Sequence, residues 1–296
     1  MSEWPTRRAF LKASAAALTG TVLGLPRRAE APAPPPPASL ALFGGGPITG
    51  LFLDFLREGP CKASLAAGKK PLIVVITSAA QDGPGARQGW EKAFAKDEFE
   101  IAFIHTRKEA DSVIAQQLIR RAAGVMLGGG DQANLVPALA GTKAQEAIFD
   151  QLGNPNFTLG ATSAGTAACP IEMIENWENE ESVERLRPEE RRAIFAHGLG
   201  FINAITDTHL FCSRIDRTPR LTDALARHPD LTCIGLGERA GLIIQRSHAR
   251  VVGENQVEVL RSGPNGPEEH IYPPGREFPL DIRLQYASRP MAVARP

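Results

Sequence analysis

Short apolar runs alternate with amphipathic segments from Leu40 onward. Five runs have the length and the apolar content of buried strands, and they lie at 40–43, 71–77, 99–105, 124–127 and 157–161. Three segments between them can form helices, at 85–96, 112–122 and 142–152. Alternating strands and helices predict a parallel sheet with helices on both faces and ligand groups at the carboxyl ends of its strands. We expect an α/β fold, a three-layer sandwich with a mainly parallel central sheet.

The last third of the chain has a different pattern. Short strands follow one another at hairpin spacing, at 233–236, 241–245, 249–252 and 256–260. This spacing predicts an antiparallel C-terminal edge on the sheet. Residues 172–192 are unusually charged, and we expect them to form an exposed lid or insertion.

The first residues have the layout of an export signal. Arg7, Arg8 and Lys12 precede a weakly apolar stretch at 13–26, which is too short for a confident membrane-spanning helix. The paired arginines followed by Phe-Leu-Lys resemble a twin-arginine signal, although an incidental basic amphipathic start is the alternative. The resemblance implies a signal at 1–31, export by the twin-arginine machinery, and a periplasmic or secreted protein. A proline-rich linker at 32–39 and a single α/β domain at 40–296 would follow.

Composition narrows the function classes. The chain has 33 Lys and Arg against 33 Asp and Glu, so its formal charge is zero, and nucleic-acid binders usually carry a basic excess. We therefore expect no nucleic-acid partner. The four cysteines are too scattered for a disulfide framework or a zinc site, and we expect buried thiols; they are Cys61, Cys169, Cys212 and Cys233.

Three places carry candidate chemistry. Ser163 stands between small residues at a strand-to-helix turn, as a nucleophile elbow requires. The glycine turn at 128–130 exposes backbone N–H groups that suit a phosphate or an oxyanion. Asp207 and His209 are two apart on a predicted strand, so we expect both to face one pocket. Each of these motifs, taken alone, also fits an ordinary turn or a structural histidine.

Together, the motifs resemble the cyanophycinase and peptidase E family of serine peptidases. The resemblance covers about residues 40–260, and its motifs stand in family order. They are Gly-Gly-Asp-Gln at 129–132, Thr-Ser-Ala-Gly at 162–165, Gly-Leu-Gly at 198–200, Asp-Thr-His at 207–209, Arg-Leu at 220–221, Ile-Gly-Leu-Gly-Glu at 234–238 and Val-Gly-Glu-Asn-Gln-Val at 252–257. The resemblance implies a fold like class I glutamine amidotransferases, with serine in place of their nucleophilic cysteine.

The resemblance also implies roles for individual residues. Ser163 matches the nucleophile and His209 the general base. Glu181, which is 18 residues after the nucleophile, matches the third member of the triad, with Glu178 and Glu180 close by.

Further positions follow from the same resemblance. The oxyanion donors would be the N–H groups of Ala164 and Gly130. Four residues match positions that contact or pair with the substrate, and they are Gln132, Asp207, Arg217 and Arg220. The two arginines would hold free carboxylates of the substrate, and Asp207 a guanidinium group.

These observations predict an exported serine peptidase that hydrolyses cyanophycin or β-aspartyl-arginine isopeptide units through a Ser-His-Glu triad. One alternative is a peptidase E-like dipeptidase that cuts after an N-terminal aspartate. Another is a catalytically silent relative that binds peptides in the periplasm. The chemistry needs neither a metal nor an organic cofactor. A homodimer stays open beside a monomer.

Overall fold

A sheet of eight strands forms the centre of the fold. The computed structural model describes residues 38–94, 98–178, 183–187, 190–211, 216–282 and 284. Within them, the strands run in the order β14-β11-β10-β1-β5-β4-β2-β3. The strands are β1 (Ser39–Phe43), β2 (Leu72–Ile76), β3 (Glu100–Ile104), β4 (Gly124–Leu127), β5 (Thr158–Thr162), β10 (Ala240–Gln245), β11 (His248–Gly253) and β14 (Glu277–Pro279). The first five pair in parallel, whereas β10, β11 and β14 add an antiparallel edge. The predicted α/β class is confirmed.

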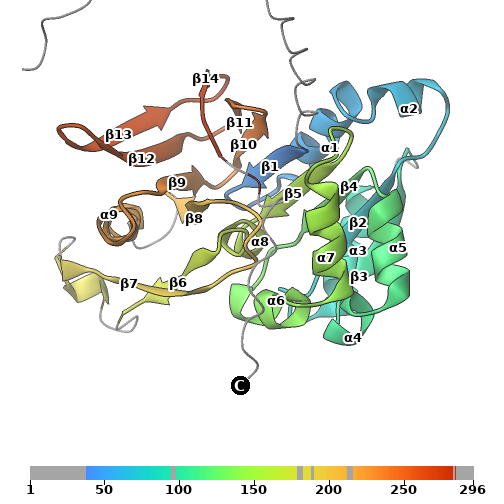
Figure 1. The fold of residues 1–296 in the computed structure, drawn as a ribbon, viewed down its shortest axis with the longest axis horizontal. Coiled ribbons are helices and arrows are strands. Elements are labelled where there is room, and N and C mark those ends of the chain that lie inside the picture. Colours follow the sequence, from blue (N-terminus) through green and yellow to red (C-terminus); the bar gives the residue numbers. More distant parts are fainter. Residues whose placement is uncertain are drawn as a thin grey trace, which may run out of the picture. The chain divides into compact units, whose positions relative to one another are not determined.

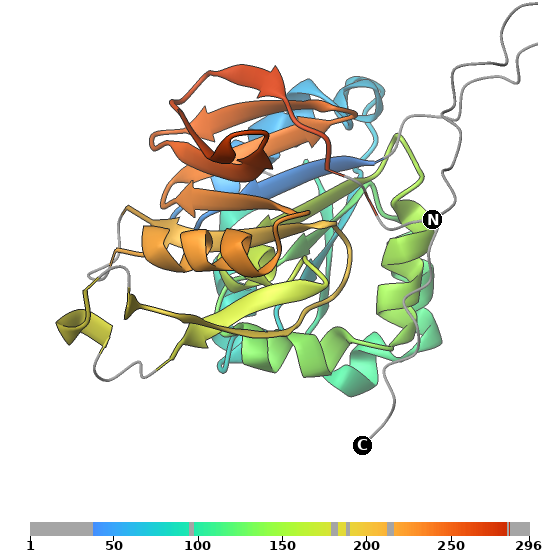
Figure 2. The same cartoon turned by 60° about the vertical axis from the view of Figure 1, so that its left-hand side comes forward.

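Helices cover both faces of this sheet, as Figures 1 and 2 show. On one face lie α1 (Thr49–Glu58), α2 (Lys62–Ala66) and α3 (Gly83–Ala93); on the other lie α4 (Arg107–Ala110), α5 (Val113–Arg121), α6 (Gln132–Leu139), α7 (Lys143–Gln151) and α8 (Ala164–Ala167). Strand β2 shows why both layers are needed. Val74 and Ile76 pack toward α5, α6 and α7, whereas Ile73 and Val75 pack toward α1, and all are fully buried. An apolar run without alternation therefore marks a strand covered on both sides.

A second sheet of four strands stands beside the first, in the order β13-β12-β9-β8. Its members are β8 (Ala204–Leu210), β9 (Thr232–Gly237), β12 (Val257–Gly263) and β13 (Gly266–Tyr272), and α9 (Thr218–Arg227) packs against it. The predicted antiparallel edge is present as β10, β11 and β14, but it does not include every strand that we assigned to it. Two of the expected strands, at 233–236 and 256–260, belong to this second sheet, and β9 pairs in parallel with β8.

The charged segment at 172–192 is not only a surface lid. It begins with β6 (Glu172–Trp177), which pairs with β7 (Ala193–His197) in an antiparallel ribbon below α9 in Figure 1. Met173, Ile174 and Trp177 are buried, so the ribbon presents an apolar side to the body of the protein. The predicted insertion thus contributes to the core.

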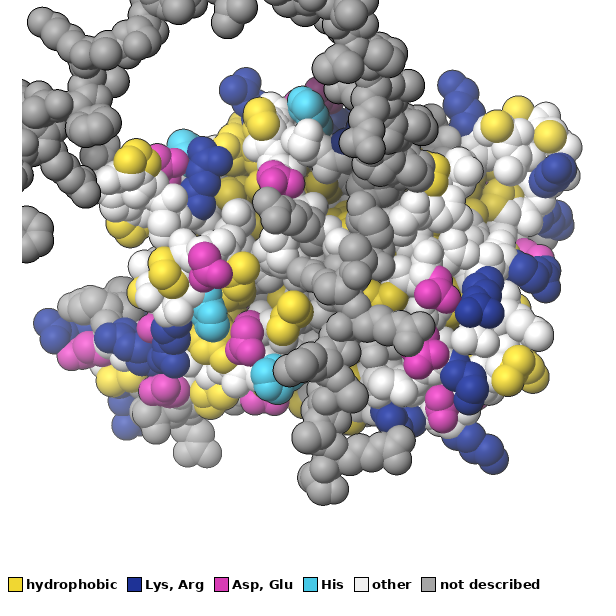
Figure 3. Space-filling view, viewed as in Figure 1, with side chains coloured by type: hydrophobic (Ala, Val, Ile, Leu, Met, Phe, Trp, Pro, Cys, Tyr) yellow, Lys and Arg dark blue, Asp and Glu magenta, His cyan; other side chains and the backbone are white. Residues whose placement is uncertain are grey.

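The predicted signal and linker can be compared with the structure only in part. Strand β1 starts at Ser39, whereas the predicted signal and nearly all of the linker lie outside the described residues. Among the described residues, no helix has the length and hydropathy to cross a membrane. The face in Figure 3 mixes basic and acidic side chains, in keeping with the balanced charge of the chain.

Candidate active site

Ser163 occupies a strained turn between β5 and α8. Its φ of 52° is positive, which is uncommon for a residue with a side chain. The turn is tight on all sides. A Cβ on Gly165 would stand 2.3 Å from the carbonyl oxygen of Leu127, and one on Gly129 would stand 3.2 Å from Cβ of Ser163. The predicted elbow therefore has the geometry that exposes a nucleophile, and backbone strain of this kind clusters at functional sites.

His209 meets Ser163 from the neighbouring sheet. It lies near the end of β8, and its Nε2 is 2.7 Å from Oγ of Ser163. The backbone of His209 also has a positive φ, of 55°, and the pairing of β8 with β9 shifts register between Asp207 and Leu210. This irregularity breaks the strand alternation from which we expected Asp207 and His209 to share a pocket. It instead turns the imidazole toward Ser163.

Glu238 supplies the carboxylate on the other side of the ring. It follows β9, and its Oε1 lies 2.8 Å from Nδ1 of His209. A ring protonated at Nδ1 donates to Glu238 and can accept the hydroxyl proton of Ser163 at Nε2. Glu181, predicted for this place, lies outside the described residues. The sequence did single out the Ile-Gly-Leu-Gly-Glu word at 234–238, but without assigning its glutamate to the histidine.

The glycine turn after β4 lies directly beside the nucleophile. The contact of Gly129 with Ser163 fixes this placement, and Gly130 packs so closely on Ala79 that a Cβ would stand 2.2 Å from its carbonyl oxygen. Gly130 has a φ of +140°, which further favours glycine. The N–H of Ala164 belongs to the first turn of α8, where helical N–H groups have no partner within the helix. Both predicted oxyanion donors are thus on segments that touch Ser163.

Asp207 and Arg220 lie close together and form an ion pair with each other. Arg220 donates from Nε and Nη2 to both carboxylate oxygens of Asp207, at 2.6 and 2.7 Å. The side chains are 8% and 2% exposed, and the guanidinium also lies over the ring of Trp177, 5.2 Å from its centroid. We expected these two residues to bind a substrate carboxylate and a guanidinium. The structure instead uses their charges to tie α9 to β8 and β6.

Arg217 and Gln132 also contact the protein itself. Arg217 precedes α9 and donates from Nη1 to the carbonyl oxygen of Thr208, at 2.8 Å, which places it one residue from His209. The Nε2 of Gln132 donates to the carbonyl oxygen of Glu175 in β6, at 2.7 Å. Gln132 begins α6 directly after the glycine turn. It therefore links the predicted oxyanion turn to the β6–β7 ribbon, and its predicted contact with substrate stays a prediction.

The cysteines within the described residues are poor candidates for a nucleophile. Burial raises the pKa of Cys61 to about 11 and those of Cys169 and Cys233 to about 12, so these thiols stay protonated at neutral pH. Cys212 lies outside the described residues. Among those described, no three His, Cys, Asp or Glu side chains gather closely enough to hold a metal ion. The reactive group offered by the described site is the Ser163 hydroxyl.

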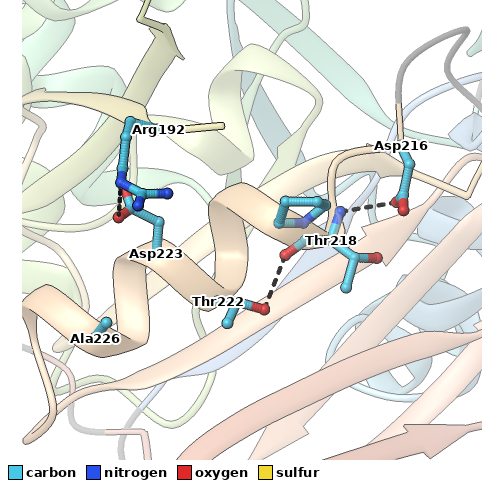
Figure 4. Close-up of a pocket in the computed structure, with 7 residues that line it drawn as sticks. Arg192, Asp216, Thr218, Thr222, Asp223 and Ala226 are labelled. Atoms are coloured by element: carbon cyan, nitrogen blue, oxygen red, sulfur yellow. Dashed lines mark hydrogen bonds and ion pairs between the residues drawn. The ribbon is translucent and has the colours of Figure 1, made fainter. Parts of the chain in front are cut away.

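A separate cavity of about 510 Å³ lies on the outer side of α9. Figure 4 shows two of its contacts, in which the Asp216 carboxylate accepts the N–H of Thr218 and Arg192 lies beside Asp223. Neither Ser163 nor its two partners line this cavity. Its two carboxylates, of Asp216 and Asp223, already contact other groups of the protein, and we assign the cavity no function.

The sequence is similar to those of known proteins. Residues 62–252 match peptidase family S51. The chain is 29% identical over 201 residues to the cyanophycinase of Geminocystis herdmanii, a match that covers 66% of this chain and 71% of that protein. It is 30% identical over 200 residues to the cyanophycinase of Trichormus variabilis, covering 66% and 65% respectively. A peptidase E of Nostoc is 26% identical over 198 residues, covering 67% and 76%.

Two solved structures share the fold. One is a peptidase from an acI-B1 Actinobacterium, with a TM-score of 0.62, 23% identity, and coverage of 83% of this chain and 98% of that chain. The other is a putative peptidase E protein from Listeria monocytogenes, with a TM-score of 0.50, 12% identity, and coverage of 73% and 98%.

Proposed function

The chain belongs to peptidase family S51, and we propose that it is a serine peptidase whose catalytic triad is Ser163, His209 and Glu238. One observation carries the proposal: the continuous path from the Ser163 hydroxyl through the imidazole to the Glu238 carboxylate, with contacts of 2.7 and 2.8 Å. We give the acid role to Glu238 in place of the predicted Glu181, because the Glu238 carboxylate meets Nδ1.

The proposed reaction follows from these contacts. Oγ of Ser163 attacks the carbonyl carbon of the scissile amide while its proton passes to Nε2 of His209. The imidazolium then gives this proton to the leaving nitrogen as the C–N bond breaks. Water attacks the acyl ester and loses a proton to the same Nε2, and this proton returns to Oγ. Glu238 stays ionised, holds the ring in place and stabilises its charged form.

The oxyanion of each tetrahedral intermediate needs fixed donors. The N–H groups of Ala164 and of the turn ending at Gly130 flank Ser163 and suit this role. Loss of one such donor typically costs about 3 kcal/mol of transition-state stabilisation. Both donors are backbone groups, so side-chain replacements elsewhere in the site leave them in place.

For the substrate we propose cyanophycin or β-aspartyl-arginine isopeptide units. The names of two cyanophycinase relatives support this class, and so does Arg217, whose guanidinium is near the strand end that carries His209. A forked guanidinium suits a free carboxylate of such a substrate. The peptidase E relative supports a second candidate, a dipeptidase that cuts after an N-terminal aspartate.

The experiment is a product analysis with the purified full chain. Cyanophycin, β-aspartyl-arginine and α-aspartyl dipeptides are incubated with the wild type, with Ser163→Ala, and with Ser262→Ala as a control on an exposed strand end. We expect β-aspartyl-arginine or its amino acids from the wild type and the control, and nothing from Ser163→Ala. Hydrolysis of the α-aspartyl peptides alone would favour the second candidate. Equal turnover by a folded Ser163→Ala would refute the serine mechanism.

We also propose export by the twin-arginine route, on the basis of Arg7, Arg8 and the apolar stretch that follows. In a bacterial host that has this route, the full chain should accumulate in the periplasm or medium. The Arg7→Lys/Arg8→Lys variant should stay in the cytoplasm. Equal distribution of the two proteins would contradict this proposal and leave the peptidase assignment untouched.

A further inference from the structure

The three groups of the proposed triad come from three separate segments. Ser163 follows β5 of the large sheet, His209 lies near the end of β8 in the second sheet, and Glu238 is in the turn after β9. These groups stay within hydrogen-bond distance of one another only if the three segments keep fixed relative positions. The ladder between β8 and β9 does not hold His209, because the register of that pair shifts between Asp207 and Leu210.

The end of β1 contacts all three segments. The carbonyl oxygen of Phe43 accepts the N–H of Ser163 at 3.1 Å. The next carbonyl oxygen, of Gly44, accepts the N–H of His209 at 3.0 Å. The one after that, of Gly45, accepts the N–H of Arg239, the neighbour of Glu238, at 2.9 Å. Three consecutive carbonyl groups thus receive one hydrogen bond from each segment of the triad.

Gly45 lies directly against the imidazole ring of His209. A Cβ at this position would stand 2.3 Å from Cε1 of His209, 2.9 Å from Nδ1 and 3.0 Å from Nε2. Its φ of +126° is a further conformation that L-residues rarely adopt. Gly44 is equally confined, since a Cβ there would lie 2.1 Å from the carbonyl oxygen of Gly237. The loop can therefore approach both His209 and the Glu238 turn only because it has no side chains.

We infer that the segment from Phe43 to Gly45 is a positioning element that sets the Ser163–His209 and His209–Glu238 distances, with Gly45 as its decisive residue. The inference rests on the proposed function, for which it names a residue that acts through the position of His209. Its physical basis is that three adjacent peptide groups in one short segment cannot shift independently. A change in that segment moves the imidazole relative to both of its partners.

The test compares Gly45→Ala with two matched controls. Gly46→Ala also carries a positive φ, of +76°, but its Cβ would meet first the flexible side chain of Arg239, 3.1 Å from Cγ, and would make only an ordinary contact with Cβ of Glu238, at 4.0 Å. Gly68→Ala has a φ of +69° and nothing within 4 Å, so it reports backbone strain alone. We expect Gly45→Ala to lower kcat on the order of 100-fold, the usual cost of displacing a catalytic group by about 1 Å, with KM within twofold of the wild type. Both controls should keep kcat within about threefold.

Two spectroscopic measurements do not depend on turnover. In the wild type, the Nδ1 proton shared with Glu238 should give a far-downfield NMR signal, which Gly45→Ala should lose and both controls keep. The backbone amides of His209 and Arg239 should also be protected from hydrogen exchange in the wild type, because they donate to Gly44 and Gly45. The exchange measurement tests the two hydrogen bonds to Gly44 and Gly45 even if Gly45→Ala does not fold.

The outcomes separate the inference from the proposed function. A wild type without hydrolytic activity would contradict the proposed function, and the exchange data would still test the loop. Normal kcat and an unchanged downfield signal in Gly45→Ala would overturn the inference while the peptidase assignment stands. Rapid exchange of the His209 and Arg239 amides in an otherwise protected wild type would overturn it as well.

Discussion

Replacing Glu258 by glutamine should stabilise the protein, and more so at alkaline pH. Glu258 lies on β12 and is 1% exposed, and neither of its carboxylate oxygens has a hydrogen-bond partner at normal distance among the described residues. Burial raises its pKa from 4.5 to about 7, and the negative charges of Glu269, Asp216 and Asp207 act in the same direction. Only the nearby Thr218 hydroxyl opposes the rise. The folded protein therefore keeps this group protonated at pH values where the unfolded chain has released the proton.

The size of the effect follows from the two pKa values. Each pKa unit corresponds to about 1.4 kcal/mol, so the full difference between 4.5 and about 7 is worth about 3 kcal/mol. Below pH 4 both states bind the proton and there is no contribution. As pH rises the unfolded state ionises first, so folding loses about 1 kcal/mol by pH 5 and about 3 kcal/mol above pH 8. Glutamine removes this dependence because it does not ionise.

The assay is urea unfolding of the wild type and Glu258→Gln at pH 5 and pH 8.5. We expect the free energy of unfolding of the variant, relative to the wild type, to increase by about 2 kcal/mol between the two pH values. The control is Glu58→Gln, which makes the same replacement at the exposed end of α1. A pH-independent difference for Glu258→Gln would show that the carboxyl is solvated or paired, and would refute the reasoning.

Two further predictions concern the site. Glu238→Gln should lower kcat by roughly 10⁴, which is the cost of losing the acid in the best-studied triad. Glu181→Gln should change kcat by less than about threefold. The reverse result in steady-state assays would return the acid role to Glu181. Arg220→Lys should lower the free energy of unfolding by on the order of 2 kcal/mol, because an ammonium cannot make the forked contact that Asp207 receives. Arg217→Lys should instead raise KM several-fold with little change in Tm. Unchanged stability of Arg220→Lys in urea unfolding, or unchanged KM of Arg217→Lys, would contradict these assignments.

The sequence predicted the large sheet well because its strands are defined locally. Leu72–Ile76 is an uninterrupted apolar run, which a strand covered on both faces requires, and the helices around it carry their own caps and periodicity. The strand-to-helix turn at Ser163 was equally predictable, since such an elbow needs small residues around the serine. These features depend on a few neighbouring residues, which a pattern can capture.

The remaining features depend on contacts between distant segments. Glu238 reaches His209 only because β9 pairs with β8, and nothing in the residues around Glu238 reveals this pairing. The pairing of Asp207 with Arg220 likewise depends on how α9 docks, so the sequence indicated two charged groups near the site but not that each neutralises the other. The register shift at His209 also defeated a prediction based on strict strand alternation. For the third member of the proposed triad, the one signal in the sequence was that Glu238 ends the Ile-Gly-Leu-Gly-Glu motif at 234–238.

Covalent labelling tests the central claim, that Ser163 is a nucleophile activated by His209 and Glu238. The wild type, Ser163→Ala and Glu238→Gln are treated with a fluorophosphonate, and the mass of each protein and of its peptides is measured over time. We predict one adduct, on the peptide that contains Ser163, with much slower formation in Glu238→Gln and none in Ser163→Ala. An adduct on another residue, or equal labelling rates for the wild type and Glu238→Gln, would contradict the account.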